Sequence, residues 1–254
     1  MKKLLIIVLL SFSQTAIVYA DDTWTDVGVY AFMTDVDGDV EIGNVTSDVD
    51  VPFKDILENL DFGFMGYVEH RRGKWSFIGD IFYADISVDD TVASNAIASV
   101  ELDVVLKQVL AEGYVGYRVL ERKDGAAYLG VDVLAGIRYN KIDVDIGAEI
   151  NVLSLSAAAS RSADIDWTDA VVGVRAQYDF GNGWGITGLA DIGEGSDSKS
   201  YQLMGFVNYQ YSDDLKLFGG YRHYHLEQDE TVNGLAYKLD LDYAGPMFGI
   251  SKRF

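Results

Sequence analysis

The chain of 254 residues contains no cysteine, only two prolines and only three histidines. Without cysteine there can be no disulfide bond, no thiolate metal site and no lipid attached through a cysteine. Basic residues are also scarce, with 20 Lys and Arg against 40 Asp and Glu and a formal net charge of −20. A surface this acidic argues against nucleic acid as a partner.

A long apolar run is the next missing feature. After residue 20 no stretch of about twenty apolar residues occurs, so the sequence predicts no membrane-spanning helix. Two classes remain open at this point. A soluble periplasmic protein fits this absence, and so does a transmembrane β-barrel, whose signal is alternation along short segments.

The first twenty residues have the pattern of a secretory signal peptide. Lys2 and Lys3 form a positive start, Leu4–Leu10 is apolar, and Val18–Ala20 ends on small residues before two aspartates. We expect cleavage after Ala20. Residues 1–20 are therefore assigned to the signal peptide and residues 21–254 to one barrel domain.

The end of the chain alternates between two faces. Ala244, Pro246, Phe248 and Ile250 lie on the face that ends at Phe254, whereas small or polar residues fill the other face. This end resembles the closing strand of bacterial outer-membrane β-barrels, which typically finish on Phe. The resemblance implies a Gram-negative outer membrane, insertion by the barrel assembly machinery, and contact with outer-membrane lipid and lipopolysaccharide.

Tight turns and long acidic segments follow each other in alternation along the chain. The tight turns are predicted at 72–74, 122–125, 181–183 and 212–214, and the acidic segments at 34–61, 88–101, 143–166, 193–200 and 228–242. Short periplasmic turns with long outer loops are typical of membrane barrels. The sequence predicts an all-β, antiparallel up-and-down barrel of about ten strands. Eight strands remain open, and so do twelve if Asp37-Gly38 closes a further hairpin.

The inward faces of these strands gather charges of both signs. In a narrow barrel such groups must pair or remain hydrated, so they predict either a salt-bridge core that closes the lumen or a charged constriction in a pore. The predicted luminal network comprises Glu69, Arg71, Asp80, Glu112, Arg118, Asp132, Arg138, Arg175, Asp191, Arg222 and Arg253.

One segment, VPFKDILENLD at 51–61, has helical rather than strand periodicity. Phe53, Ile56, Leu57 and Leu60 lie on one helix face, and Pro52 suits a helix start. A helix of about ten residues is unstable alone in water, so another surface must cover this face. We expect it to fold into the barrel mouth as a plug.

The histidines raise an enzymatic alternative. His223 and His225 lie in the segment YRHYH near the outer end of a predicted strand, and alternation turns both toward lipid, whereas the third, His70, lies elsewhere. Omptin proteases resemble this only in outline, with ten strands and rim His and Asp residues, and no omptin motif is present. Lipid A deacylases use Ser and His on the outer barrel face, but no serine stands out near these histidines. No catalytic residue is assigned.

The segment from Asp35 to Glu41 reads DVDGDVE and invites a calcium interpretation. The EF-hand loop requires Gly at its sixth position, which here is Val40, so an acidic turn is the simpler interpretation. No specific metal site and no cofactor are predicted, although the acidic loops could bind divalent cations weakly.

The sequence therefore favours a non-enzymatic outer-membrane barrel that is either structural or a narrow, cation-favouring pore. A barrel enzyme and a surface binding protein or adhesin are the alternatives. The segment Asp48–Asp85 is also similar to a group of uncharacterised proteobacterial outer-membrane proteins, and that resemblance implies no activity.

Overall fold

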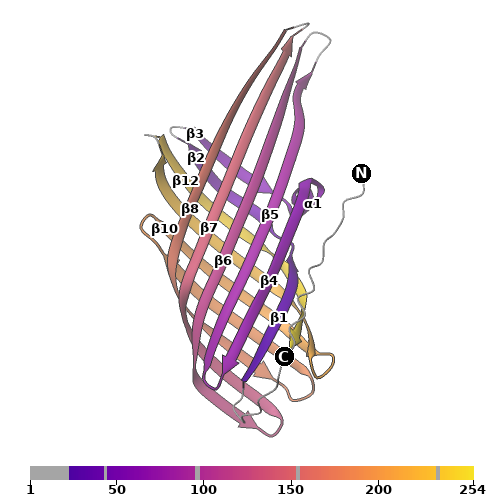
Figure 1. Cartoon of the computed structure of the whole chain (residues 1–254), viewed down its shortest axis with the longest axis vertical. Helices are drawn as coiled ribbons and strands as arrows, with labels where there is room; N and C mark the ends of the chain where they lie inside the picture. The colour runs from indigo at the N-terminus through magenta and orange to yellow at the C-terminus, as the bar shows by residue number, and fades with distance from the viewer. Residues whose placement is uncertain (1–22, 43–44, 95–97, 153–154, 233–234) are drawn as a thin grey trace.

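The computed structural model describes residues 23–42, 45–94, 98–152, 155–232 and 235–254. They form a closed antiparallel barrel of ten strands with two further strands at one rim (Figure 1). The predicted fold class and strand number are confirmed. The predicted signal peptide lies outside the described residues.

The ten barrel strands are β1 (Thr23–Phe32), β4 (Leu60–Arg72), β5 (Trp75–Ser94), β6 (Ala98–Asp124), β7 (Ala127–Val152), β8 (Leu155–Asp179), β9 (Trp184–Glu194), β10 (Ser198–Gln210), β11 (Leu215–Val232) and β12 (Leu235–Arg253). Each pairs with its neighbours in this order, and β1 pairs with β12 to close the ring. In the closing ladder Val29 lies opposite Ile250, and the Phe254 nitrogen donates to the Thr25 carbonyl at 2.8 Å. The closing strand therefore ends beside the first strand.

The four predicted tight turns are all at the end of the barrel that holds Thr23 and Phe254. Gly73 and Gly125 adopt φ values of 57° and 59°, which glycine reaches without strain, and they close the β4–β5 and β6–β7 hairpins. In the β10–β11 turn, hydrogen bonds from Ser212 and Lys252 lower the pKa of Asp214. In membrane-spanning β-barrels the short turns lie at the periplasmic end, so the long hairpins lie at the extracellular end.

Strands β5 to β8 rise well above the rest of the outward rim as one tall sheet (Figure 1). The sequence interpretation placed loops at 88–101 and 143–166, but most of these residues are strand. In these extensions, apolar residues that face the barrel interior still alternate with acidic residues on the outer surface of the wall. On β7, Ile142 and Val144 pack into an interior apolar cluster, while Asp143 and Asp145 lie on the opposite face. The acidic residues on the outer surface of these strands are the reason that the sequence predicts loops here.

The further strands, β2 (Asp35–Ile42) and β3 (Val45–Val51), form a hairpin against the outer half of β12. Phe32 of β1 lies opposite Met247 and Asp35 of β2 lies opposite Ala244, so β2 continues the line of β1 along β12. The predicted turn at Asp37-Gly38 is therefore strand. Gly38, with φ 144°, is required there because a Cβ would lie 2.0 Å from the Asp240 carbonyl oxygen.

The helix α1 (Phe53–Asn59) bridges a short break in the barrel wall. The β1–β4 ladder ends at Val29 opposite Gly66, although β4 continues outward to Leu60. The chain crosses from β3 to β4 through α1, which contacts β2 and β5. The Asp35 carboxylate accepts a hydrogen bond of 2.7 Å from the Phe53 nitrogen, which suits a helix start.

This placement differs from the predicted plug. None of the seven residues of α1 is buried, and Leu57 is 55% exposed. Of the predicted plug residues only Leu60, which the structure assigns to β4, packs against the interior apolar cluster. The strands themselves supply the side chains that fill the lumen at this level. Helical periodicity identified the helix, but it could not show that the wall has a break for it to cover.

The exterior of the barrel is apolar. Outward residues such as Val29, Phe64, Ile137 and Val207 are between 46% and 60% exposed. Near the tight turns aromatic rings pack edge to face or tilted, as in Trp75–Tyr117 at 4.9 Å and Trp184–Tyr209 at 4.7 Å. An apolar band flanked by aromatic rings matches a lipid environment. In the described residues, no helix is long and apolar enough to cross a membrane.

Candidate functional site

Two clusters of buried ion pairs cross the lumen. We name the first the Asp132 cluster: Glu69, Arg71, Arg118, Asp132 and Arg175. Asp132 is fully buried and accepts hydrogen bonds from Arg71 and Arg175, each at 2.8 Å, and a short one from Arg118. Glu69 binds Arg175 at 2.7 Å. Three arginines thus face two carboxylates.

The second cluster lies nearer the extracellular end of the barrel. We name it the Arg138 cluster: Asp80, Glu112, Tyr114, Arg138, Asp191, Gln202 and Arg222. Arg138 is fully buried and lies 2.7 Å from both Glu112 and Asp191. Arg222 binds the second oxygen of Glu112 at 3.0 Å. Three carboxylates here face two arginines, so the two clusters together are formally neutral. A mutual balance of this kind is what makes buried charges tolerable.

Neighbouring strands position these side chains in register. On β7, Asp132 and Arg138 both face inward because they are an even number of residues apart. Arg138 lies opposite Glu112 on β6, and Asp132 lies opposite Arg118 on β6 and Arg175 on β8. The ion pairs are therefore largely cross-strand neighbours, with Arg71 and Asp191 reaching in from other walls.

Every predicted luminal residue takes part in an ion pair, but Arg253 stands apart. It binds Asp26 at 2.9 Å near the periplasmic rim, where Lys216 also binds Asp26 at 3.0 Å. Sequence analysis missed Asp26, although its alternation on β1 gave the signal. It also missed Tyr114 and Gln202, because only charged residues were considered for the network.

Inside the barrel, an apolar layer lies on the extracellular side of the Arg138 cluster. Its buried side chains come from strands around the barrel: Phe32, Phe82, Leu110, Ile142, Trp167, Tyr224, Leu226, Leu241 and Tyr243. The Tyr224 ring lies 5.0 Å from the Arg138 guanidinium, which joins the two layers by a cation–π contact. The luminal network predicted from the sequence contains charged residues alone and does not include this layer.

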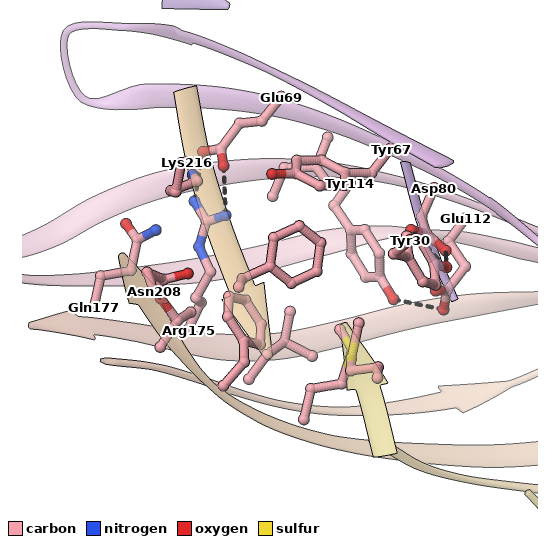
Figure 2. Close-up of a pocket in the computed structure, with 17 residues that line it drawn as sticks. Tyr30, Tyr67, Glu69, Asp80, Glu112, Tyr114, Arg175, Gln177, Asn208 and Lys216 are labelled. Atoms are coloured by element: carbon pink, nitrogen blue, oxygen red, sulfur yellow. Dashed lines mark hydrogen bonds and ion pairs between the residues drawn. The ribbon is translucent and has the colours of Figure 1, made fainter. Parts of the chain in front are cut away.

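Between the two clusters the structure contains a cavity of about 140 Å³ (Figure 2). Glu69 and Arg175 of the Asp132 cluster lie at one end of it, and Asp80, Glu112 and Tyr114 of the Arg138 cluster lie toward the other. A larger cavity of about 380 Å³ lies at the periplasmic mouth, and we call it the vestibule. Arg71, Arg118 and Trp24 are among its walls.

The histidines lie on the outward face, as their alternation predicted. His223 lies 2.6 Å and His225 lies 3.2 Å from the same oxygen of Asp242, and the Tyr201 ring stacks on His225 at 4.8 Å. Asp242 thus contacts both histidines from the neighbouring strand β12. Within the described parts of the chain, no group of three or more His, Asp or Glu side chains is arranged to hold a metal ion.

Comparison with known proteins identifies the fold. No protein-family model matches the chain, and no curated protein matches it. Among solved structures, the outer membrane protease OmpT from Escherichia coli is similar, with a TM-score of 0.50 and 7% identity over 94% of this chain and 99% of OmpT. Ail, the attachment invasion locus protein of Yersinia pestis, matches at a TM-score of 0.32 and 12% identity, over 91% of this chain and 98% of Ail. A Pseudomonas aeruginosa FadL homologue matches at a TM-score of 0.33 and 9% identity, over 91% of this chain and 90% of that chain.

At such low identities the likeness concerns the fold alone. The chain therefore has the closed barrel and apolar exterior of bacterial outer-membrane β-barrels, the fold that it shares with OmpT. The similarity to omptins remains one of outline.

Proposed function

We propose that the protein is a non-enzymatic outer-membrane barrel, closed to ions, that binds cationic partners at its outer surface. The observation that carries this proposal is a pair of aspartate rows on the outward face of β12, β2 and β3. Asp242, Asp37 and Asp50 lie side by side across the three strands, and so do Asp240, Asp39 and Asp48.

Like charges directly opposite each other destabilise a sheet. The inward positions of the same strands are apolar: Val40, Val49 and Leu241 pack on the interior cluster. The fold therefore needs the apolar face. Of the six adjacent carboxylates, Asp242 contacts His223 and His225 and Asp240 lies 3.9 Å from His225, but these contacts do not require the rows to continue across β2 and β3. A function that uses negative charge accounts for them.

Cationic partners match this surface in charge. Divalent cations that bridge these carboxylates to lipopolysaccharide phosphates are one such class, and basic polypeptides are another. The complete burial of Arg138 where it crosses the barrel supports a role at the surface rather than conduction through the lumen.

A fourfold change of Asp37, Asp39, Asp48 and Asp50 to Asn tests this surface. We expect an oligolysine peptide to bind the refolded variant in micelles about tenfold more weakly than the wild type at low salt, since four of the six charges are lost. Surface plasmon resonance measures the affinity. The free energy of unfolding should stay equal or rise, because repulsion between strands is relieved.

A matched control neutralises four exposed acidic residues at the periplasmic end: Glu121, Asp124, Asp213 and Asp214. This variant loses the same charge but should bind the peptide within about twofold of the wild type. Equal weakening in both variants would mean that only net charge matters, and it would remove the aspartate rows from the proposal.

A narrow, cation-favouring pore is the second candidate. The vestibule and the central cavity follow one another from the periplasmic end and share Glu69, Gln177, Thr187, Asn208 and Lys216 in their walls. Conduction would require both the Arg138 cluster and the apolar layer to open. Planar-bilayer recording of the refolded wild-type protein separates the two candidates, because only the pore gives steady current steps.

A further inference from the structure

The central cavity has a chemical character that a closed, surface-binding barrel does not use. Figure 2 shows polar side chains at its two ends, with Gln177, Asn208 and Lys216 at one and Tyr30 and Asp80 at the other. The wall between them is mainly apolar, formed by Ile78, Leu189, Met204, Phe206, Phe218 and Met247. Two aromatic rings, Phe206 and Phe218, pack at 5.7 Å within this wall.

The charged groups around the cavity are already paired. Glu69 binds Arg175, Asp80 accepts a hydrogen bond from Tyr30 at 2.8 Å, and Glu112 binds Arg138 and Arg222. A charged ligand would have to break one of these buried pairs, which is costly. A neutral ligand avoids that cost.

Capacity for hydrogen bonds remains at the periplasmic end. The Gln177 oxygen accepts from Arg118 at 3.0 Å and the Asn208 nitrogen donates to Thr187 at 3.1 Å, so each amide has its other group to offer. Lys216 donates one hydrogen bond to Asp26 at 3.0 Å and carries two more N–H groups. One polar substituent on a ligand can therefore be satisfied here.

Size sets the remaining limit. An apolar cavity of about 150 Å³ accommodates benzene. The central cavity, at about 140 Å³, has room for one ring of that size. The vestibule shares five wall residues with it, which gives a path from the periplasmic end.

We infer that the central cavity is a binding site for a neutral, mostly apolar molecule of single-ring size that carries one hydroxyl or amide group. The ring lies against Phe206, Phe218 and Leu189. The polar substituent faces Gln177, Asn208 and Lys216. This site is independent of the aspartate rows, so either proposal can fail alone.

The test uses the refolded mature chain in detergent micelles and 4-fluorophenol as the probe, followed by fluorine NMR. We expect saturable binding with a dissociation constant between about 10 μM and 10 mM, the range that a ligand of so few atoms can reach. Linear partition of the probe, equal to that in empty micelles, would overturn the inference.

Two isoleucines of β5 provide matched variants. Ile78 lines the cavity, whereas Ile81 faces outward and is 40% exposed. Ile78→Trp should fill the cavity and weaken binding at least tenfold, and Ile81→Trp should leave it within twofold. Unchanged binding in Ile78→Trp would place the probe elsewhere and contradict the site.

Two further measurements keep the inference testable. If Ile78→Trp does not refold, Leu189→Phe fills the same wall with a smaller change and should weaken binding at least threefold. The anion 4-fluorobenzenesulfonate should bind at least tenfold more weakly than 4-fluorophenol, because the two cations in the cavity wall already bind carboxylates, Lys216 with Asp26 and Arg175 with Glu69 and Asp132. Equal binding of the two probes would refute the neutral ligand class.

Discussion

Replacing Arg138 with methionine is expected to lower the free energy of unfolding by about 3–5 kcal/mol, because it leaves buried carboxylates without their partner. Arg138 is fully buried and binds both Glu112 and Asp191 at 2.7 Å. Methionine keeps much of the side-chain length, so the change removes the charge and its hydrogen bonds more than the packing. Guanidinium unfolding of the protein in lipid vesicles measures the effect.

The same substitution at Arg122 is the control. Arg122 is exposed near the periplasmic β6–β7 turn, so Arg122→Met should change the free energy of unfolding by no more than about 0.5 kcal/mol. Adding Asp191→Asn to Arg138→Met should recover part of the loss, since it removes one of the unpaired charges. A loss below about 1 kcal/mol for Arg138→Met would show that this cluster is hydrated rather than buried.

A second large effect is expected at the other cluster. Asp132→Asn keeps the side-chain shape but leaves Arg71, Arg118 and Arg175 with Glu69 as the remaining carboxylate. We expect a loss of about 3–5 kcal/mol in the free energy of unfolding, because three buried cations then lack their central acceptor.

The control for this change is Asp213→Asn in the exposed β10–β11 turn. It should alter the free energy of unfolding by no more than about 0.5 kcal/mol. If Asp132→Asn proved as mild as its control, water or an anion from the vestibule would have to be replacing the carboxylate. The description of this cluster as buried ion pairs held by one central carboxylate would then be wrong.

The faces of the barrel strands could be predicted from sequence because their period is two. Arg138 and Asp132 on β7, and Glu112 on β6, were assigned to the lumen from alternation alone. Their partners could not be predicted, since strand register and closure decide which residues lie opposite. Arg138 meets Asp191 of β9 across the lumen, and no spacing in the sequence relates the two.

Other features depended on tertiary context. The sequence predicts loops for the tall parts of β5 to β8 because their solvent-facing positions carry acidic residues such as Asp143, which are typical of long outer loops. The helix α1 was identified from Phe53, Ile56 and Leu57, but the break in the wall that it bridges follows from where the β1–β4 ladder ends. Asp242, which orients both outward histidines, could be identified only from the register of β11 and β12.

The central claim is that the Arg138 cluster and the apolar layer on its extracellular side close the lumen. Planar-bilayer recording of the refolded wild-type protein tests it most directly. We expect no stable current steps above the baseline of the protein-free bilayer. Steady, cation-selective steps from the wild-type protein would contradict the closed lumen and favour the narrow pore instead.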